Sequence, residues 1–371
     1  MIMLKFMPIT ALTNKKRVFV GMSGGVDSSL SAALLKEGGF DVVGVFIKVW
    51  QPDFAFCDWK KERLDAMRVA VRLGIPFKTY DFEKEYKKEV VDYMIEEYKD
   101  GRTPNPDVMC NKYIKFGSFL NKATKEGADF VATGHYAGKS QISNLKSKRY
   151  KLLKGVDQNK DQSYFLWTLK RKQLEKIIFP IGYLKKSQVR EEARKRGLPV
   201  ADKKDSQGLC FVGKIDMKDF LKEYIKERQG DVLNESGEVI GYHDGVFLYT
   251  MGERKGFVIT KKTPRDKPYY VVEKDILQNV LVVSNEVKKE NFESVTDTIL
   301  MKNVNWIGSP PDEEKKIEAR LRYRQNLRKC RVFDANDGWQ AKFDDIQESV
   351  TPGQSIVFYD KEECLGGGII R

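Results

Sequence analysis

The sequence predicts an α/β protein: a doubly wound parallel sheet, followed by a small central domain and a C-terminal β-barrel. In the N-terminal half, apolar runs of strand length alternate with amphipathic stretches of helix length, an order that builds parallel sheets covered by helices. From Gly230 onward, Gly, Asn and Asp turns separate short alternating runs, as in all-β domains. The chain of 371 residues is long enough for two or three such domains.

The elements of the N-terminal half follow one another in order. Apolar runs predict strands at residues 18–20, 40–49, 75–82 and 128–133. Helical periodicity predicts helices at residues 30–35, 59–73, 83–99, 114–126, 169–176 and 187–196. Gly134 and His135 follow the last of these strands, so we assign them to the carboxyl edge of the sheet, where ligands bind. The basic stretch 139–154 is expected to form a loop or hairpin over that edge.

The C-terminal half begins with a predicted helix at residues 216–228 and then changes to strands. Alternating runs predict strands at residues 246–250, 269–273, 280–284, 317–323, 331–334, 340–344 and 355–359. The turn sequence Asn336-Asp337-Gly338 between two of these runs is a strong hairpin signal.

Composition limits the class of protein. The chain has 66 Lys and Arg against 53 Asp and Glu, and the net charge of +13 favours a polyanionic partner or, alternatively, is solvated surface charge. Five cysteines without a C-x-x-C pair argue for a reducing compartment and against a disulfide framework or a zinc finger. No apolar stretch approaches bilayer length, and the first fifteen residues lack a secretory signal. We therefore expect a cytoplasmic protein with no membrane association, in which residues 1–15 are a flexible leader.

The most informative segment is the glycine-rich turn between the first strand and the first helix. Gly24 and Gly25 permit backbone torsions and close approaches that a Cβ would block. The helix N-terminus directs its N–H groups and its positive dipole at the same point, and Asp27 supplies a carboxylate that can orient a hydrated Mg²⁺. Hydroxyl donors come from Ser23, Ser28 and Ser29. A Walker loop would end in Gly-Lys-Ser/Thr, but this loop has no lysine, so it predicts a phosphate-binding loop of another type.

Two of the cysteines have unusual surroundings. Cys110 ends a stretch with two prolines and two asparagines, which predicts an ordered loop, and Asp107 lies three residues before its thiol. Cys210 is also expected in a loop, with two lysines upstream. Nearby cations favour the nucleophilic thiolate, whereas a free cysteine is by default a small buried hydrophobe, so both interpretations stay open for this pair. The buried default fits Cys330 and Cys364.

A row of arginines marks the predicted strand at residues 317–323. Arg320, Arg322 and Arg324 alternate along it, so they are expected on one face, with Leu321 and Tyr323 on the other. Such a face suits contacts with a phosphate backbone and base stacking; the alternative is an ordinary solvated strand face.

Short motifs along the chain complete the pattern. They are Gly21-Met-Ser-Gly-Gly-Val-Asp-Ser28, Gly101-Arg-Thr-Pro-Asn-Pro-Asp107 with Cys110-Asn-Lys112, Ala132-Thr-Gly-His-Tyr136, Lys160-Asp-Gln-Ser-Tyr164, Asp205-Ser-Gln-Gly-Leu-Cys-Phe211, Arg322-Tyr-Arg-Gln325 and Thr351-Pro-Gly-Gln354. Together with the end Leu365-Gly-Gly-Gly-Ile369, they closely resemble the bacterial tRNA-specific 2-thiouridylases of the ATP-pyrophosphatase superfamily. The resemblance runs from about Val18 to the C-terminus, and the paired cysteine motifs are its most specific part.

The resemblance implies an enzyme that uses ATP and Mg²⁺ to replace the C2 oxygen of the wobble uridine by sulfur in tRNAs for Lys, Glu and Gln. It implies an ATP-pyrophosphatase domain at residues 1–217, a small central domain at 218–287 and a tRNA-binding β-barrel at 288–371. The implied partners are tRNA and a persulfide sulfur donor, either a cysteine desulfurase or a sulfur-relay protein. The free protein is expected to be a monomer.

The resemblance also assigns site residues by position, and none of them is a resident metal ligand. Cys210 would carry a persulfide, Cys110 would be the second catalytic thiol, and Asp107 would act as a base or orient the uridine. The residues implied in ATP binding are Gly21, Met22, Ser23, Gly24, Gly25, Val26, Asp27, Ser28, Ile47 and Gly134. The residues implied in contacts with the target uridine or the rest of the tRNA are Asn105, Pro106, Asp107, His135, Lys160, Asp161, Gln162, Arg322, Tyr323 and Gln354.

Two departures and two rival functions complete the prediction. The family often has Met at the position of Ile47. Tyr113 follows the Cys110 motif with no third cysteine nearby, which argues against an iron–sulfur cluster unless the fold recruits Cys57. One rival is another adenylating enzyme that forms a C–N bond and needs neither Cys110 nor Cys210. The other is a non-catalytic RNA-binding protein that uses the barrel.

Overall fold

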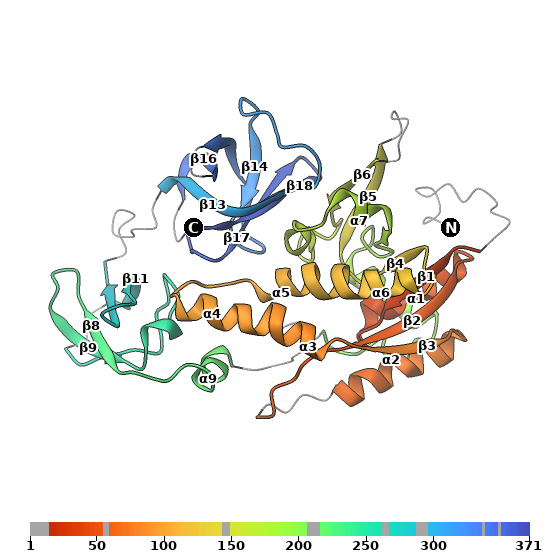
Figure 1. Cartoon of the computed structure of the whole chain (residues 1–371), viewed down its shortest axis with the longest axis horizontal. Coiled ribbons are helices and arrows are strands. Elements are labelled where there is room, and N and C mark those ends of the chain that lie inside the picture. The colour runs from red at the N-terminus through yellow and green to blue at the C-terminus, as the bar shows by residue number, and fades with distance from the viewer. Residues whose placement is uncertain are drawn as a thin grey trace. The chain divides into compact units, whose positions relative to one another are not determined.

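A computed structural model of the chain describes residues 15–54, 59–142, 149–205, 216–261, 267–286, 296–335, 338–347 and 350–371. The chain forms two compact units. The first comprises Met1–Val90, Asp107–Lys214 and Glu362–Cys364, and the second comprises Val91–Pro106, Ile215–Lys361 and Leu365–Arg371. Figure 1 shows the chain and labels many of its helices and strands.

The first unit is built on a parallel sheet with the strand order β3-β2-β1-β4-β7. The strands are β1 (Arg17–Gly21), β2 (Asp41–Lys48), β3 (Phe77–Asp81), β4 (Phe130–Ala132) and β7 (Ile177–Ile178). The helices that begin in or cross into this unit are α1 (Val26–Glu37), α2 (Trp59–Leu73), α3 (Glu83–Tyr86), η2 (Lys87–Asp92), α5 (Pro106–Met109), η3 (Cys110–Phe119), α6 (Leu120–Lys125), η4 (Ser163–Leu166), α7 (Arg171–Glu175) and α8 (Lys186–Lys195).

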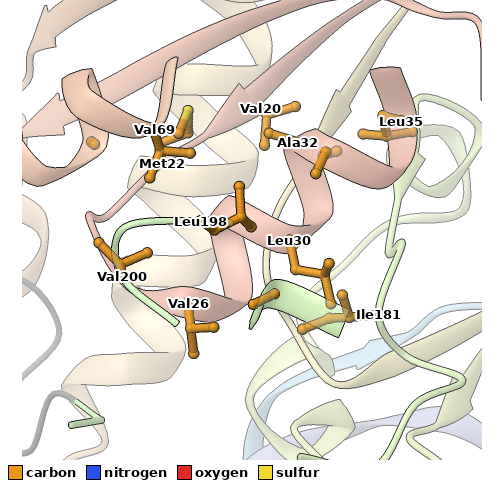
Figure 2. Packing of buried hydrophobic residues seen from close by; sticks show 14 of the residues in the cluster. Val20, Met22, Val26, Leu30, Ala32, Leu35, Val69, Ile181, Leu198 and Val200 are labelled. Carbon is orange, nitrogen blue, oxygen red and sulfur yellow. The ribbon is translucent and has the colours of Figure 1, made fainter. Parts of the chain in front are cut away.

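Helices cover both faces of this sheet. Val18 and Val20 of β1 point to one face and are fully buried in a core that includes residues of α1, α2 and α8. Figure 2 shows part of that core, with Val20, Leu30 and Val69 among its labelled members. Gly21 lies on the opposite face, because side chains alternate along a strand, and there the ring of Phe119 approaches to 3.5 Å from the place of a Cβ. The predicted doubly wound parallel sheet is therefore confirmed.

A hairpin follows the sheet's fourth strand. β5 (Ala137–Ile142) and β6 (Arg149–Lys154) pair antiparallel, as expected for the stretch 139–154. β6 also pairs with Glu363 and Cys364, which belong to the first unit although they lie near the C-terminus.

The second unit contains a small sheet and a barrel, as predicted. The sheet has the order β10-β9-β8-β12-β11, with β8 (Gly230–Leu233), β9 (Val239–His243), β10 (Val258–Ile259), β11 (Tyr270–Asp275) and β12 (Val280–Ser284). The barrel runs β13-β16-β15-β14-β17-β18 and closes by pairing of β13 with β18. Its strands are β13 (Thr296–Trp306), β14 (Ile317–Arg320), β15 (Arg328–Ala335), β16 (Gly338–Gln347), β17 (Ser355–Asp360) and β18 (Glu363–Ile370). The unit also contains the helices α4 (Tyr93–Lys99), α9 (Met217–Lys222) and η5 (Val246–Leu248).

The barrel core follows the two-residue period of its strands. Ile317 and Ala319 of β14 and Cys330 and Val332 of β15 are all buried in one apolar cluster. β15 and β16 pair antiparallel up to Ala335 and Gly338, which confirms the predicted hairpin; Asn336 and Asp337 of its turn lie outside the described residues.

Several predicted elements differ from the structure. The strand predicted at residues 246–250 is wrong: the segment forms the 3₁₀-helix η5, whose preceding residue Gly245 donates its N–H to the ring of His243. The helix predicted at residues 216–228 is shorter, since α9 ends at Lys222. In the described ranges, no helix is long and apolar enough to cross a membrane.

Candidate functional site

The loop between β1 and α1 lies at the carboxyl edge of the parallel sheet, as predicted. Gly24 adopts φ +75°, and a Cβ there would lie 2.3 Å from the carbonyl oxygen of Glu62. Any larger residue would therefore push the loop away from α2. Gly25 is the N-cap of α1 and has no side chain that could accept a hydrogen bond from the first N–H groups of the helix. The geometry suits an anion at the helix N-terminus.

The serines of this loop serve mainly to shape it. The hydroxyl of Ser28 donates to the carbonyl of Gly25 at 3.2 Å and accepts from the backbone N–H of Ser23. Ser29 is fully buried and donates to the same Gly25 carbonyl at 2.8 Å. The Ser29 hydroxyl is thus used inside the helix turn in this structure.

Gly134 brings the end of β4 against the start of α1. A Cβ at this position would lie 2.6 Å from the backbone nitrogen of Ser28 and 2.8 Å from the carbonyl carbon of Asp27. Met22, Val26 and Ile47 are each at most 3% exposed, and their side chains pack in the core of this unit.

Asp27 is the carboxylate of the loop, and its partners come from distant segments. Tyr136 donates its hydroxyl to Asp27 Oδ1 at 2.7 Å. Lys186, the first residue of α8, donates to both carboxylate oxygens at 2.8 Å. Burial, and then the charge of Asp27, raises the pKa of Tyr136, so the phenol stays protonated and remains a donor. Asp27, the carboxylate predicted to orient a hydrated Mg²⁺, therefore pairs with the ammonium group of Lys186 in this structure.

A second carboxylate, Asp205, gathers three cations next to this pair. It accepts from Lys160 at 2.7 Å, from Lys186 at 2.8 Å and from Arg190 at 2.8 Å. Burial alone would raise the pKa of the Asp205 carboxyl, but hydrogen bonds from Lys160 and Lys186 lower it to about 2. Asp205 is thus ionised at neutral pH.

Lys203 anchors the loop from the other side. Its ammonium donates to the carbonyl of Gly24 at 3.1 Å and to the carboxylates of Glu62 and Asp65, both at 2.8 Å. It ties the tight turn at Gly24 to the first turns of α2. Sequence reasoning noted Lys203 only as a cation near Cys210 and missed Lys186, because no local pattern marks a lysine that reaches a loop more than 150 residues away.

Cys110 does not lie in a loop, and this prediction is corrected. A helical segment starts at Pro106 and continues through Cys110 into the π-helix η3. Proline is favoured at the first helical position, and the Asp107 carboxylate in the first turn suits the helix dipole, so the same residues that indicated a loop start a helix. The Cys110 side chain is 0% exposed.

Asn111, the residue after Cys110, is hydrogen-bonded to another segment of the first unit. Asn111 donates its side-chain amide to the carbonyl of Phe165 at 3.1 Å, while its buried carbonyl oxygen has no hydrogen-bond partner among the described residues. The π-helical turn is a conformation often found at functional sites. Cys210 and Cys57 lie outside the described residues.

His135, Asp161 and Gln162, implied in tRNA contacts, have structural partners. The His135 ring is 7% exposed, packs between Phe116 and Phe179, and has its Nδ1 2.7 Å from the hydroxyl of Thr133. Burial, with the nearby charge of Lys115, lowers the pKa of His135 well below its usual value. Asp161 is 2% exposed and accepts from the backbone N–H groups of Gly155 and Ser163. Gln162 accepts from the backbone N–H of Tyr136 at 3.0 Å.

In the second unit, the expected arginine face does not form. β14 ends at Arg320, and Arg324 adopts φ +65°, so Arg322 and Arg324 lie in a turn rather than on the strand. The side-chain oxygen of Gln325 accepts the backbone N–H groups of Leu321 and Arg322, which pulls the chain out of the extended conformation. Arg322 and Tyr323 are then presented by a turn at the end of the strand.

Three of the motifs come together within this unit. The Arg322 guanidinium donates to the hydroxyl of Thr351 at 2.8 Å. Gln354 donates its amide to the carbonyls of Thr103 and Pro104 at 2.8 and 3.2 Å, and Thr103 donates its N–H to the Pro352 carbonyl. The segment that precedes Asn105 and Pro106 is therefore bound to the 351–354 turn of the barrel.

In the part of the chain that the structure describes, no group of three or more His, Cys, Asp or Glu side chains is arranged to hold a metal ion.

Family models match the chain in three consecutive segments. Residues 16–214 match the tRNA methyl transferase HUP domain, residues 218–285 the tRNA methyl transferase PRC-barrel domain, and residues 296–370 the aminomethyltransferase beta-barrel domain.

Curated relatives are similar over nearly the whole length. The chain is 45% identical over 362 residues to the tRNA-specific 2-thiouridylase MnmA of Pseudomonas entomophila, covering 96% of this chain and 95% of the relative. It is 46% identical over 359 residues to the enzyme of the same name from Listeria monocytogenes, covering 95% and 94%. Among solved structures, the U34-tRNA thiolase NcsA from Methanococcus maripaludis is 19% identical with a TM-score of 0.37, covering 60% of this chain and 71% of that one.

Proposed function

The chain belongs to the tRNA-specific 2-thiouridylase family, and on that premise we propose how its residues carry out the reaction. It is a sulfurtransferase that thiolates uridine in tRNA. The observation that carries this function is an identity of 45% that covers 96% of the chain. We assign the wobble uridine of tRNAs of the Lys, Glu and Gln type as the target.

ATP binds, in this proposal, at the loop between β1 and α1. The tight turn at Gly24, the N-terminus of α1 and the close approach of Gly134 support a phosphate site there. Residues Gly21 to Ser28 hold the phosphates, mainly through their backbone N–H groups, and the backbone of Ile47 borders the adenine. The C2 oxygen of uridine attacks the α-phosphorus, and pyrophosphate leaves.

The loop residues fit a Mg²⁺ ion that accompanies ATP. Asp27 is the loop's carboxylate, its side chain is 31% exposed, and both its oxygens already face the cationic Lys186. A carboxylate together with nucleotide phosphates is the usual magnesium environment, and the ion would neutralise phosphate charge. Lys186, once displaced from Asp27, would be free to pair with a phosphate oxygen.

Adenylation is needed because the uridine C2 carbonyl is a poor electrophile with no leaving group. Attached to AMP, the former carbonyl oxygen can depart. The terminal sulfur of a persulfide on Cys210 attacks C2, and AMP leaves with that oxygen. The Cys110 thiolate then attacks Sγ of Cys210 and breaks the S–S bond. The sulfur stays on C2, and Cys110 and Cys210 form a disulfide that a dithiol reductant reopens.

Asp107 and the tRNA-contacting residues complete the proposed site. Asp107 lies one helical turn before Cys110, where it serves as a base or orients the flipped uridine with Asn105 and Pro106. Contacts elsewhere on the tRNA come from Lys160, Asp161, Gln162, Arg322, Tyr323 and Gln354, and His135 belongs to the same set. The partly exposed Lys160 and the exposed Arg322 suit phosphate groups, whereas the buried Asp161 and His135 act by shaping the backbone.

The remaining assignments follow the family. The donor is a persulfide-carrying protein, either a cysteine desulfurase or a sulfur relay, and the reaction takes place in the cytoplasm on a monomeric enzyme. We assign residues 1–217 to the catalytic domain, 218–287 to the central domain and 288–371 to the tRNA-binding barrel.

One reaction tests this function. The protein is incubated with ATP, Mg²⁺, a persulfide donor and unmodified tRNA, and the digested tRNA is analysed by mass spectrometry. The proposal expects 2-thiouridine together with AMP and pyrophosphate. ADP and phosphate as the nucleotide products would overturn the adenylation step.

A further inference from the structure

The motif around Cys210 begins with Asp205, and the reaction as proposed gives Asp205 no role. Its carboxylate is nevertheless the centre of an ion cluster. Oδ2 accepts from Lys160 at 2.7 Å, and Oδ1 accepts from Lys186 and from Arg190, both at 2.8 Å. All of these residues belong to the first unit. The Asp205 side chain is 32% exposed to water, and ion pairs at such a site contribute little to stability, so stability alone does not account for three cations on one carboxylate.

The cluster continues to the nucleotide loop through Lys186. The Lys186 side chain is 13% exposed, and its ammonium lies 2.8 Å from both oxygens of Asp27 and 2.8 Å from Asp205. The charges therefore alternate along a connected series: Asp27, Lys186, Asp205, Lys160. One end is the loop proposed to bind ATP, and the other end is a lysine proposed to contact tRNA.

Asp205 is itself held in place by the backbone around it. Arg190, one turn after Lys186 on α8, donates to the carbonyls of Ala201 and Lys203 as well as to Asp205. Lys203 in turn binds the carbonyl of Gly24 and the carboxylates of Glu62 and Asp65. The segment 201–205 is thus attached to α8 on one side and to the nucleotide loop on the other.

Holding a lysine side chain in one conformation costs rotamer entropy, and fixing it before the ligand arrives improves binding. We propose that Asp205 is a positioning residue for both substrates, one carboxylate that orients Lys186 toward ATP and Lys160 toward tRNA. The assignment rests on the proposed function, because it takes the loop as the ATP site and Lys160 as a tRNA contact.

The first test compares Asp205→Asn with Asp202→Asn in the full-length protein. Asp202 lies on the same segment, and its side chain is 76% exposed and pairs with Arg194, away from the cluster. Dissociation constants are measured separately for a non-hydrolysable ATP analogue with Mg²⁺ and for unmodified tRNA. Asp205→Asn is expected to weaken both, each by roughly 3- to 10-fold for a partly exposed ion pair, and Asp202→Asn neither. Unchanged affinities for both ligands in a folded Asp205→Asn protein would overturn the proposal.

Double-mutant cycles separate positioning from a merely structural role. Lys186→Gln is expected to weaken ATP binding, and the double variant Lys186→Gln, Asp205→Asn should bind ATP hardly more weakly than Lys186→Gln alone. In the same way, Lys160→Gln is expected to weaken tRNA binding, and adding Asp205→Asn should weaken it little further. Asp205→Glu keeps the charge and is expected to restore part of both affinities. If Asp205→Asn folds poorly, Asp205→Glu can be compared with the wild type in its place. Fully additive effects in both cycles would contradict positioning. If Lys160→Gln alone leaves tRNA binding unchanged, Lys160 does not contact tRNA, and the proposal that Asp205 orients Lys160 toward tRNA fails with it. The cycle measured with the ATP analogue then still tests whether Asp205 orients Lys186.

Discussion

The ammonium of Lys186 lies 2.8 Å from each carboxylate oxygen of Asp27, a residue 159 positions earlier in the chain. A cation thus sits on the carboxylate of the phosphate-binding loop, where an ATP-bound metal ion would also be attracted. The pairing links α8 to the N-terminus of α1, and it makes Asp27 the first residue to test.

Asp27→Ala is expected to abolish thiolation while the protein stays folded. The substitution removes the loop's only carboxylate, and Lys186 keeps Asp205 as a partner, so its ammonium is not left buried alone. Thiolation is measured by mass spectrometry of digested tRNA, and folding by thermal unfolding. Asp202→Ala, which removes an exposed carboxylate, is the control and should retain activity. Normal thiolation by Asp27→Ala would contradict an ATP site at this loop.

Arg322→Ala is expected to weaken tRNA binding by roughly 1–3 kcal/mol, as for the loss of a charge-assisted phosphate contact. ATP binding should not change, and the affinity of the wild type for tRNA should fall steeply with salt. Arg68→Ala removes an exposed arginine of α2 and serves as the control for net charge. An affinity that responds neither to Arg322→Ala nor to salt would show that this turn is ordinary solvated surface.

Acid should destabilise the fold through its two histidines. His135 and His243 are both buried, and burial lowers the pKa of each below its ordinary value. In the unfolded chain the histidines take up protons near pH 6.5, whereas in the folded state they do so only at lower pH. Their contribution to the free energy of unfolding is therefore complete above pH 6.5 and is lost as the pH falls below it. The free energy of unfolding in urea should be lower at pH 5.5 than at pH 7.5. His243→Asn should reduce this difference; an identical free energy of unfolding at both pH values would contradict neutral, buried histidines.

Cys110 should react slowly with iodoacetamide in the free protein, because its side chain is 0% exposed. If it acts on a persulfide at Cys210, binding of tRNA and ATP must open this region, and its alkylation should then accelerate. Cys330 is equally buried in the barrel, where burial raises its pKa to about 12, and it should stay protected in both states. Peptide mapping gives both rates. Rapid alkylation of Cys110 without ligands would mean that its thiol is accessible to solvent in the free protein, which would contradict this prediction.

Cys330→Ser should keep thiolation but lower stability. It places a hydroxyl group in the apolar cluster with Ile317 and Val332, at a cost of about 1–3 kcal/mol if the group finds no partner. Chemical unfolding and the thiolation assay separate the two effects. Loss of activity with unchanged stability would give Cys330 a role that the proposed reaction does not contain.

Local patterns predicted the parts of the fold that depend on local physics. Apolar runs predicted β1 to β4 of the parallel sheet, alternating runs predicted β14 to β17 of the barrel, and a glycine between a strand and a helix predicted the turn at Gly24. The strands β7 and β13 were not predicted. Near Cys110 the pattern misled, because Pro106 is compatible with a loop and also with the first position of a helix. At Arg322, strand alternation was outweighed by one side chain, Gln325, that binds the backbone of the turn.

The ion cluster around Asp205 could not be predicted at all. Lys186 meets Asp27 only because α8 packs beside α1, and nothing in the sequence around either residue encodes that contact. Motifs identified Asp205 as part of a segment of interest, but its partners Lys160, Lys186 and Arg190 are set by tertiary packing.

The most direct test of sulfur transfer by two thiols is the yield of 2-thiouridine in cysteine variants. With ATP, Mg²⁺, a persulfide donor and unmodified tRNA, the wild type and Cys330→Ser should form 2-thiouridine. Cys110→Ser and Cys210→Ser should form none, although Cys110→Ser should still accept labelled persulfide sulfur on Cys210. Formation of 2-thiouridine at the wild-type rate by the Cys110→Ser, Cys210→Ser double variant would contradict the account.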